Sequence, residues 1–66
     1  MDDNPDYTTI VHIPGSRDKW VARRLSWDMR AGGDYVIIRE KGPMSKAAAE
    51  GLAVSWAAVY QLEYRP

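Results

Sequence analysis

The sequence has no cysteine, no phenylalanine and a single histidine in its 66 residues. Without cysteine, the fold contains neither a disulfide nor a cysteine-ligated metal site. His12 alone cannot complete a typical zinc site. The N-terminal residues lack the basic start and apolar run of a signal peptide, and no stretch approaches the roughly 20 apolar residues of a membrane span. We therefore expect a cytoplasmic protein with no metal, no other cofactor and no contact with a membrane.

Catalytic motifs are also missing from the sequence. No serine lies in a nucleophile-elbow pattern, and Gly32-Gly33 precedes an expected strand rather than a helix, which excludes the usual phosphate-binding loop. A pocket deep enough to shift a pKa needs more wall than so short a chain supplies. We expect no enzymatic activity and assign no catalytic residue.

The length of the chain limits it to one small domain. A domain of this size buries only about 60% of its unfolded surface, so its stability margin is narrow. Asp2, Asp3 and Asp6 give the start of the chain an acidic character, and no Lys or Arg occurs before residue 17. The sequence predicts an acidic, disordered tip over residues 1–6 and a single α+β domain over residues 7–66.

Three segments are expected to form strands. Residues 7–13 and 34–40 are rich in β-branched and aromatic residues with alternating polarity, which predicts a strand in each. Residues 19–27 fit a strand and a helix about equally well. The turn over residues 14–18 and the pair Gly32-Gly33 favour the strand, because both are typical of hairpin connections.

Residues 45–64 carry the clearest helix pattern. Ser45 is a good N-cap, and good helix formers follow it. An apolar stripe recurs every three or four residues, at Ala49, Leu52, Ala53, Trp56, Val59 and Tyr60. Residues 59–65 also alternate, so a fourth strand is the alternative there. The opposite flank of the helix is apolar too, at Ala47, Val54, Ala58 and Leu62, and one interpretation is that it closes a homodimer.

These elements predict an α+β fold in the order βββα, a three-stranded antiparallel sheet with one C-terminal helix packed on one face. The expected core consists of Val11, Ile13, Val21, Leu25, Val36, Ile38, Leu52, Trp56 and Val59. Trp27 would join this core, because it shares a strand face with Val21 and Leu25. Trp20 would lie on the opposite face beside Arg24.

Every aromatic residue is Trp or Tyr, three of the former and four of the latter. These side chains combine an apolar body with a polar group, as is typical of partly buried surfaces and of interfaces. The expected partner-binding residues of the sheet are Trp20, Arg23, Arg24 and Arg39. Arginine beside tryptophan also suits nucleic acid, which is the alternative function. Alternating arginines are more typical of the solvated face of an antiparallel sheet, and that interpretation outweighs nucleic-acid binding.

In size, compactness and strand–helix layout with its helix at residues 45–64, the chain resembles the small, cysteine-free proteins with which phages and mobile elements inhibit host machinery, the anti-CRISPR proteins among them. The resemblance implies a non-enzymatic protein that blocks a larger protein or nucleoprotein by binding it stoichiometrically. It further implies that Asp2, Asp3 and Asp6 imitate phosphates, or that the arginine face grips an acidic patch of the partner.

Overall fold

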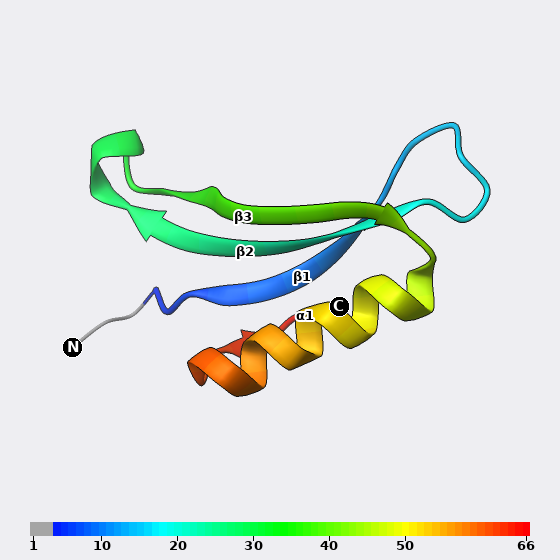
Figure 1. Cartoon of the computed structure of the whole chain (residues 1–66). Coiled ribbons are helices and arrows are strands. Elements are labelled where there is room, and N and C mark those ends of the chain that lie inside the picture. Colours follow the sequence, from blue (N-terminus) through cyan, green and yellow to red (C-terminus); the bar gives the residue numbers. More distant parts are fainter. Residues whose placement is uncertain (1–3) are drawn as a thin grey trace.

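The protein is an α+β domain with one α-helix and a four-stranded mixed sheet in its described part, residues 4–66 of a computed structural model (Figure 1). The elements are β1 (Tyr7–His12), β2 (Trp20–Asp28), a short 3-10 helix η1 (Met29–Ala31), β3 (Asp34–Met44), α1 (Lys46–Tyr60) and β4 (Glu63–Tyr64). The strand order in the sheet is β3-β2-β1-β4. The α+β class and the three long strands agree with the sequence-based prediction.

Strands β1, β2 and β3 form an antiparallel meander, so the strand interpretation of residues 19–27 is confirmed. Strand β3 is longer than predicted, because it continues through Gly42 and Pro43 to Met44. Gly42 has a φ of 145°, and a Cβ at this position would lie 2.8 Å from the Trp20 carbonyl oxygen. Glycine therefore allows the end of β3 to approach the start of β2 closely.

Helix α1 begins as predicted and ends earlier. The Ser45 hydroxyl accepts a hydrogen bond from the Ala48 amide at 3.2 Å, which caps the first turn. Gln61 adopts the left-handed conformation with a φ of 57° and ends the helix after Tyr60. The chain then forms β4, which pairs in parallel with β1.

Two predictions are thereby corrected. The helix does not extend to Tyr64, and the alternative of a fourth strand holds for two residues of that segment. The sheet is consequently four-stranded and mixed rather than three-stranded and antiparallel, and the element order is βββαβ. Glycine usually occupies the left-handed position that ends a helix. Glutamine is found there in this chain, so the end of α1 was not recognisable from the sequence.

Helix α1 packs on the sheet face that carries Thr8, Ile10 and Ala22. The Thr8 hydroxyl donates a hydrogen bond of 2.8 Å to the Ala53 carbonyl oxygen of the helix. Ala22 and Ala53 are both fully buried, which brings the helix backbone close to the sheet. The core around them consists of Ile10, Ala22, Ala49, Ala53 and Trp56, with Trp20, Met44, Leu52 and Tyr64 packed against it.

The core residues predicted on β1 and β2 lie on the wrong face of the sheet. Ile10 and Thr8 pair with Ala22 and Arg24, so the residues that alternate with them along β2, such as Leu25, point away from the helix. Trp20 consequently belongs to the helix side, and Trp27 to the opposite side. Of the expected core, Trp56 and Val21 are buried, although Val21 lies on the far face, and Ile38 and Val59 are exposed. The other expected core residues are half-buried, namely Val11, Ile13, Leu25, Val36 and Leu52.

The physical reason is the composition of the helix. Its buried residues are Ala49, Ala53, Trp56 and Ala57, so the face that contacts the sheet is mostly alanine. A helix of this kind fits closely against the small Ala22 and does not need the larger side chains of β2. The larger side chains of β2 therefore lie on the face that the helix leaves uncovered, and their size led to the wrong prediction of the buried face.

The resulting molecule is a thin slab of 39 × 25 × 15 Å with a radius of gyration of 12.3 Å. A compact chain of this length has a radius of about 10.8 Å. Figure 1 shows the helix on one side of the sheet. Within residues 4–66, no element covers the other side. We call this uncovered side the open face.

Candidate functional site

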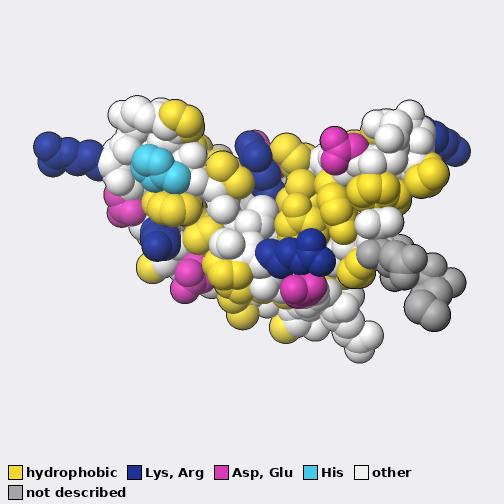
Figure 2. All heavy atoms as spheres, turned by 180° about the vertical axis from the view of Figure 1, so that it is seen from behind, with side chains coloured by type: hydrophobic (Ala, Val, Ile, Leu, Met, Phe, Trp, Pro, Cys, Tyr) yellow, Lys and Arg dark blue, Asp and Glu magenta, His cyan; other side chains and the backbone are white. Residues whose placement is uncertain are grey.

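The open face is the side of the sheet turned away from α1, as fixed by strand register. Alternation along the strands places on it the following residues: Tyr7, Thr9, Val11, Val21, Arg23, Leu25, Trp27, Tyr35, Ile37, Glu40, Glu63 and Arg65. Ile37 is 48% exposed, and Leu25, Trp27 and Tyr35 are half-buried. Figure 2 shows hydrophobic side chains gathered on the side of the molecule that is hidden in Figure 1. An apolar sheet face without a covering layer is typical of an interaction site.

Three aromatic rings are fixed at one end of the open face. The Tyr7 and Tyr35 rings meet edge to face with centroids 4.9 Å apart, and the Trp27 and Tyr35 rings do so at 5.2 Å. The Arg65 guanidinium lies over the Tyr7 ring, with its Cζ 4.4 Å from the centroid. Gly33 has no side chain to displace Trp27, whose ring lies 3.3 Å from where a Cβ would be. The rings are thus ordered before any partner arrives.

The charges on the open face are paired. Arg23 forms an ion pair with Glu40 on the neighbouring strand, and the Arg65 guanidinium lies 3.1 Å from the Glu63 carboxylate. Arg23 was among the predicted partner-binding residues, and the structure places it beside Leu25 and Glu40 on this face. The open face therefore combines an apolar and aromatic area with balanced ion pairs.

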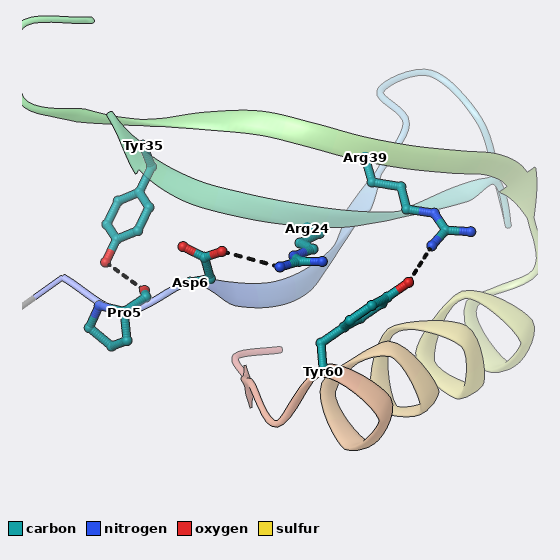
Figure 3. A network of polar contacts seen from close by, with 6 residues as sticks. All are labelled: Pro5, Asp6, Arg24, Tyr35, Arg39 and Tyr60. Carbon is teal, nitrogen blue, oxygen red and sulfur yellow. Dashed lines mark hydrogen bonds and ion pairs between the residues drawn. The ribbon is translucent and has the colours of Figure 1, made fainter. Parts of the chain in front are cut away.

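A second group of side chains lies on the helix side, and we call it the arginine cluster: Asp6, Arg24, Arg39, Trp56 and Tyr60. Figure 3 shows four of them, namely Asp6, Arg24, Arg39 and Tyr60. Arg24 Cζ lies 4.5 Å from the Tyr60 ring centroid, and Arg39 Cζ lies 4.6 Å from the Trp56 ring centroid. Arg39 Nη1 also donates to the Tyr60 hydroxyl at 3.3 Å. Both guanidinium groups are thereby held against the same turn of the helix.

The N-terminal segment contacts both the arginine cluster and Tyr35 of the open face. Arg24 Nη2 donates to Asp6 Oδ2 at 3.4 Å, and the Tyr35 hydroxyl donates to the Pro5 carbonyl oxygen at 3.1 Å. Figure 3 shows Asp6 lying beside Arg24. Asp2 and Asp3 lie outside the described residues, so phosphate imitation by the acidic tip stays a prediction.

The predicted partner-binding residues thus divide into three groups. Arg23 lies on the open face, whereas Arg24, Arg39 and Asp6 come together in the arginine cluster. Trp20 packs against the core, with the Lys46 ammonium 5.2 Å from its ring centroid and the His12 ring 5.1 Å away. The sequence had predicted Trp20 on the face opposite the core. The structure instead packs it against the core, so that prediction is wrong.

Sequence reasoning missed the aromatic partners of both surfaces. Trp56 and Tyr60 were assigned to the apolar stripe of the helix, yet Tyr60 is 43% exposed and its hydroxyl binds Arg39. Their spacing of four residues places them on one helix face, which was the available signal. Trp27 and Tyr35 would have been recognised from the hairpin register that joins them.

Three further basic residues of the N-terminal half, Arg17, Lys19 and Arg30, do not share either surface. Arg17 and Lys19 lie in the loop between β1 and β2, whereas Arg30 lies in η1 at the opposite end of β2. A groove that tracks a nucleic-acid backbone needs such charges along one path. The alternative function stays a prediction that these positions do not support.

One titratable group outside these surfaces is shifted by its surroundings. The Tyr64 hydroxyl donates to the Glu50 carboxylate at 3.4 Å. Burial of the phenol and the neighbouring negative charge of Glu50 raise the pKa of Tyr64 above its ordinary value. The neutral phenol is consequently the form that the fold favours.

Other kinds of site are not found in the described part of the chain. Residues 4–66 contain no cluster of three or more side chains suited to hold a metal ion, and no pocket. None of the helices in that range is both long enough and apolar enough to cross a bilayer.

Comparison with known proteins gives no relative. No protein-family model, no curated protein and no solved structure matches the chain. The candidate surfaces therefore have to be judged on their geometry and chemistry.

Proposed function

We propose that the protein is a small, non-enzymatic binding module that docks on a larger protein through its open face. The observation that carries this proposal is the ordered aromatic group Tyr7, Trp27 and Tyr35 on a sheet face that no described element covers. Trp, Tyr and Arg dominate the binding energy of protein interfaces, and this face holds all three.

The geometry suits binding for a further reason, which is preorganisation. Ring contacts and the Arg65 guanidinium hold the aromatic group in place, so little side-chain entropy is lost when a partner covers it. Leu25 and Ile37 extend the apolar area, and the Arg23–Glu40 pair lies at its side. The partner that fits is a protein with an apolar patch bordered by side chains of positive and negative charge.

The mode of action that we propose is stoichiometric blocking, as in the phage inhibitors of host nucleoprotein complexes that the chain resembles. A thin slab with one apolar face can cover a functional surface of a larger complex. Its small size leaves no room for a separate catalytic site beside that face.

Affinity capture from the native host with two matched variants tests the docking surface. Ile37→Asp places a charge on the open face, and Val54→Asp places one on the outer flank of the helix. The two positions are 48% and 46% exposed, so the substitutions are matched in accessibility. We expect Ile37→Asp to lose a partner that Val54→Asp retains at wild-type yield.

Loss of the partner by Val54→Asp alone would assign the docking surface to the outer flank of the helix, which is also the homodimer surface expected from the sequence. If Val54→Asp alone loses the partner, the open face is not the docking surface. Molar mass from light scattering on both variants then shows whether the flank joins two copies of this chain. Release of the captured partner by nuclease would instead favour nucleic-acid binding.

A further inference from the structure

We propose that Arg24 and Arg39 form a carboxylate-binding site, which Asp6 fills in the isolated chain and which accepts an acidic segment of a partner protein. The site lies on the helix side of the sheet and is separate from the open face. The inference rests on the proposed protein-binding function in one respect, namely that the acidic segment belongs to a partner protein. Binding at the site itself can be tested with a synthetic peptide.

Two like charges face each other at the centre of this site. Arg24 of β2 and Arg39 of β3 are directly opposite in the sheet register. Like charges in opposite cross-strand positions destabilise a sheet. Asp6 is the only acidic side chain with a hydrogen bond to either arginine among residues 4–66. The cluster therefore holds two cations and one anion, and a further carboxylate would balance its charge.

The helix holds both arginines in place for an external ligand. Arg24 lies over the Tyr60 ring, and Arg39 lies over the Trp56 ring and donates to the Tyr60 hydroxyl. A guanidinium that contacts a ring through its cationic carbon keeps N–H groups for ligands. A rigid guanidinium edge is the group that binds a carboxylate in a bidentate manner.

Within residues 4–66, donors remain unused at both arginines. Each guanidinium carries five N–H groups, and among these residues one hydrogen bond is found at each of Arg24 and Arg39. Arg24 Nε is buried and has no hydrogen-bond partner within the described residues. A buried donor without a partner carries an energetic penalty, which a second acceptor would remove.

Asp6 is a weak occupant of the site. Its contact with Arg24 is a single bond at the long distance of 3.4 Å, and both side chains are about a quarter exposed, at 26% and 24%. Pairs of this kind contribute little free energy, in the range of about 0–1 kcal/mol. A bidentate carboxylate from a partner can therefore replace Asp6 and release the N-terminal segment.

Isothermal titration at low salt with an acetylated peptide of alternating Asp and Glu tests the site on the full chain. The same peptide with Asn and Gln is the neutral control. Asp6→Asn removes the internal competitor and should tighten peptide binding by up to about fivefold, which corresponds to about 1 kcal/mol, the upper end of what such a pair contributes. Asp34→Asn changes the net charge equally at the start of β3, five residues before Arg39, and should leave affinity within about twofold.

Loss of an arginine gives the complementary comparison. Arg39→Gln should weaken peptide binding by about tenfold, because a charge-assisted hydrogen bond is lost. Arg17→Gln removes the same charge from an exposed loop and should have little effect. Circular dichroism confirms that each variant is folded, and the Nε–Hε nuclear magnetic resonance signals of Arg24 and Arg39 should shift on peptide addition to the wild type.

Three results would overturn the proposal. The first is no binding of the acidic peptide by either the wild type or Asp6→Asn. The second is equal behaviour of Arg39→Gln and Arg17→Gln, which would mean that net charge alone attracts the peptide. The third is tighter binding of an oligothymidine of equal charge, which would assign the site to phosphate. None of these results bears on the open face, so the proposed function is judged separately.

Discussion

Replacement of Ala22 by leucine examines the packing on which the position of the open face depends. Ala22 is fully buried between β1, β3 and the helix, where Ala49 and Ala53 are fully buried as well. Leucine adds three carbon atoms at a place where the neighbouring backbone leaves no room. The helix must move away from the sheet, or the side chain must adopt a strained rotamer.

The expected magnitude is large relative to the stability of the domain. Overpacking of a core destabilises by about 1–3 kcal/mol. A chain of this length has a free energy of unfolding of about 3–10 kcal/mol, from 0.05–0.15 kcal/mol per residue. Urea unfolding followed by tryptophan fluorescence should therefore show a clearly lower midpoint for Ala22→Leu with an unchanged slope.

Ala58→Leu is the control, because the same substitution is made at an exposed position of α1, the helix that covers Ala22. Its effect should stay within about 0.5 kcal/mol of zero. If Ala22→Leu and Ala58→Leu have the same stability, the helix does not cover the face that carries Ala22. The assignment of the open face would then be refuted.

Three further substitutions examine single interactions. Thr8→Val removes the hydrogen bond to the Ala53 carbonyl at nearly constant volume and should destabilise by about 1 kcal/mol in urea unfolding. Ser45→Ala removes the helix cap and should likewise lower stability, by about 1 kcal/mol. The raised pKa of Tyr64 means that stability is fully present below the ordinary tyrosine pKa and falls as pH rises through the folded value. Glu50→Gln should lower that pKa, as shown by the difference in phenolate absorbance between the two proteins; an unchanged titration would contradict the role of Glu50.

Much of the fold is visible in the sequence, because local signals and tertiary structure agree there. Alternating β-branched residues predicted β1 and β3, and Ser45 marked the beginning of α1. The turn at residues 14–18 resolved the ambiguous segment in favour of β2. Strand β4 was harder to predict, because it has only two residues and forms a strand only by pairing with β1. The helix before it ends at a glutamine, which does not mark a helix end in the sequence.

The orientation of the sheet was not predictable from the side chains of β2 alone. Trp27 and Leu25 are larger than Ala22, and size suggested that they were buried. The deciding feature is the alanine-rich face of α1, which favours a small residue beneath it. Ala49, Ala53 and Ala57 were therefore the signal that located the helix over the Ala22 face.

The candidate site was predictable in part. The sequence singled out Arg24, Arg39 and Asp6, and the structure brings all three into one cluster. Their aromatic supports come from the C-terminal helix, more than fifteen residues away in sequence, and no local pattern connects them. Arg23, adjacent to Arg24, pairs with Glu40 on the opposite face, since neighbouring strand residues point in opposite directions.

The central claim is that a partner covers the open face, and site-specific photo-crosslinking in the native host tests it most directly. A benzophenone amino acid is placed at Ile37 on the open face or at Val59 on the outer side of the helix, which is 70% exposed. We predict a discrete crosslinked protein from position 37 and none from position 59. A crosslink from position 59 alone would contradict the account.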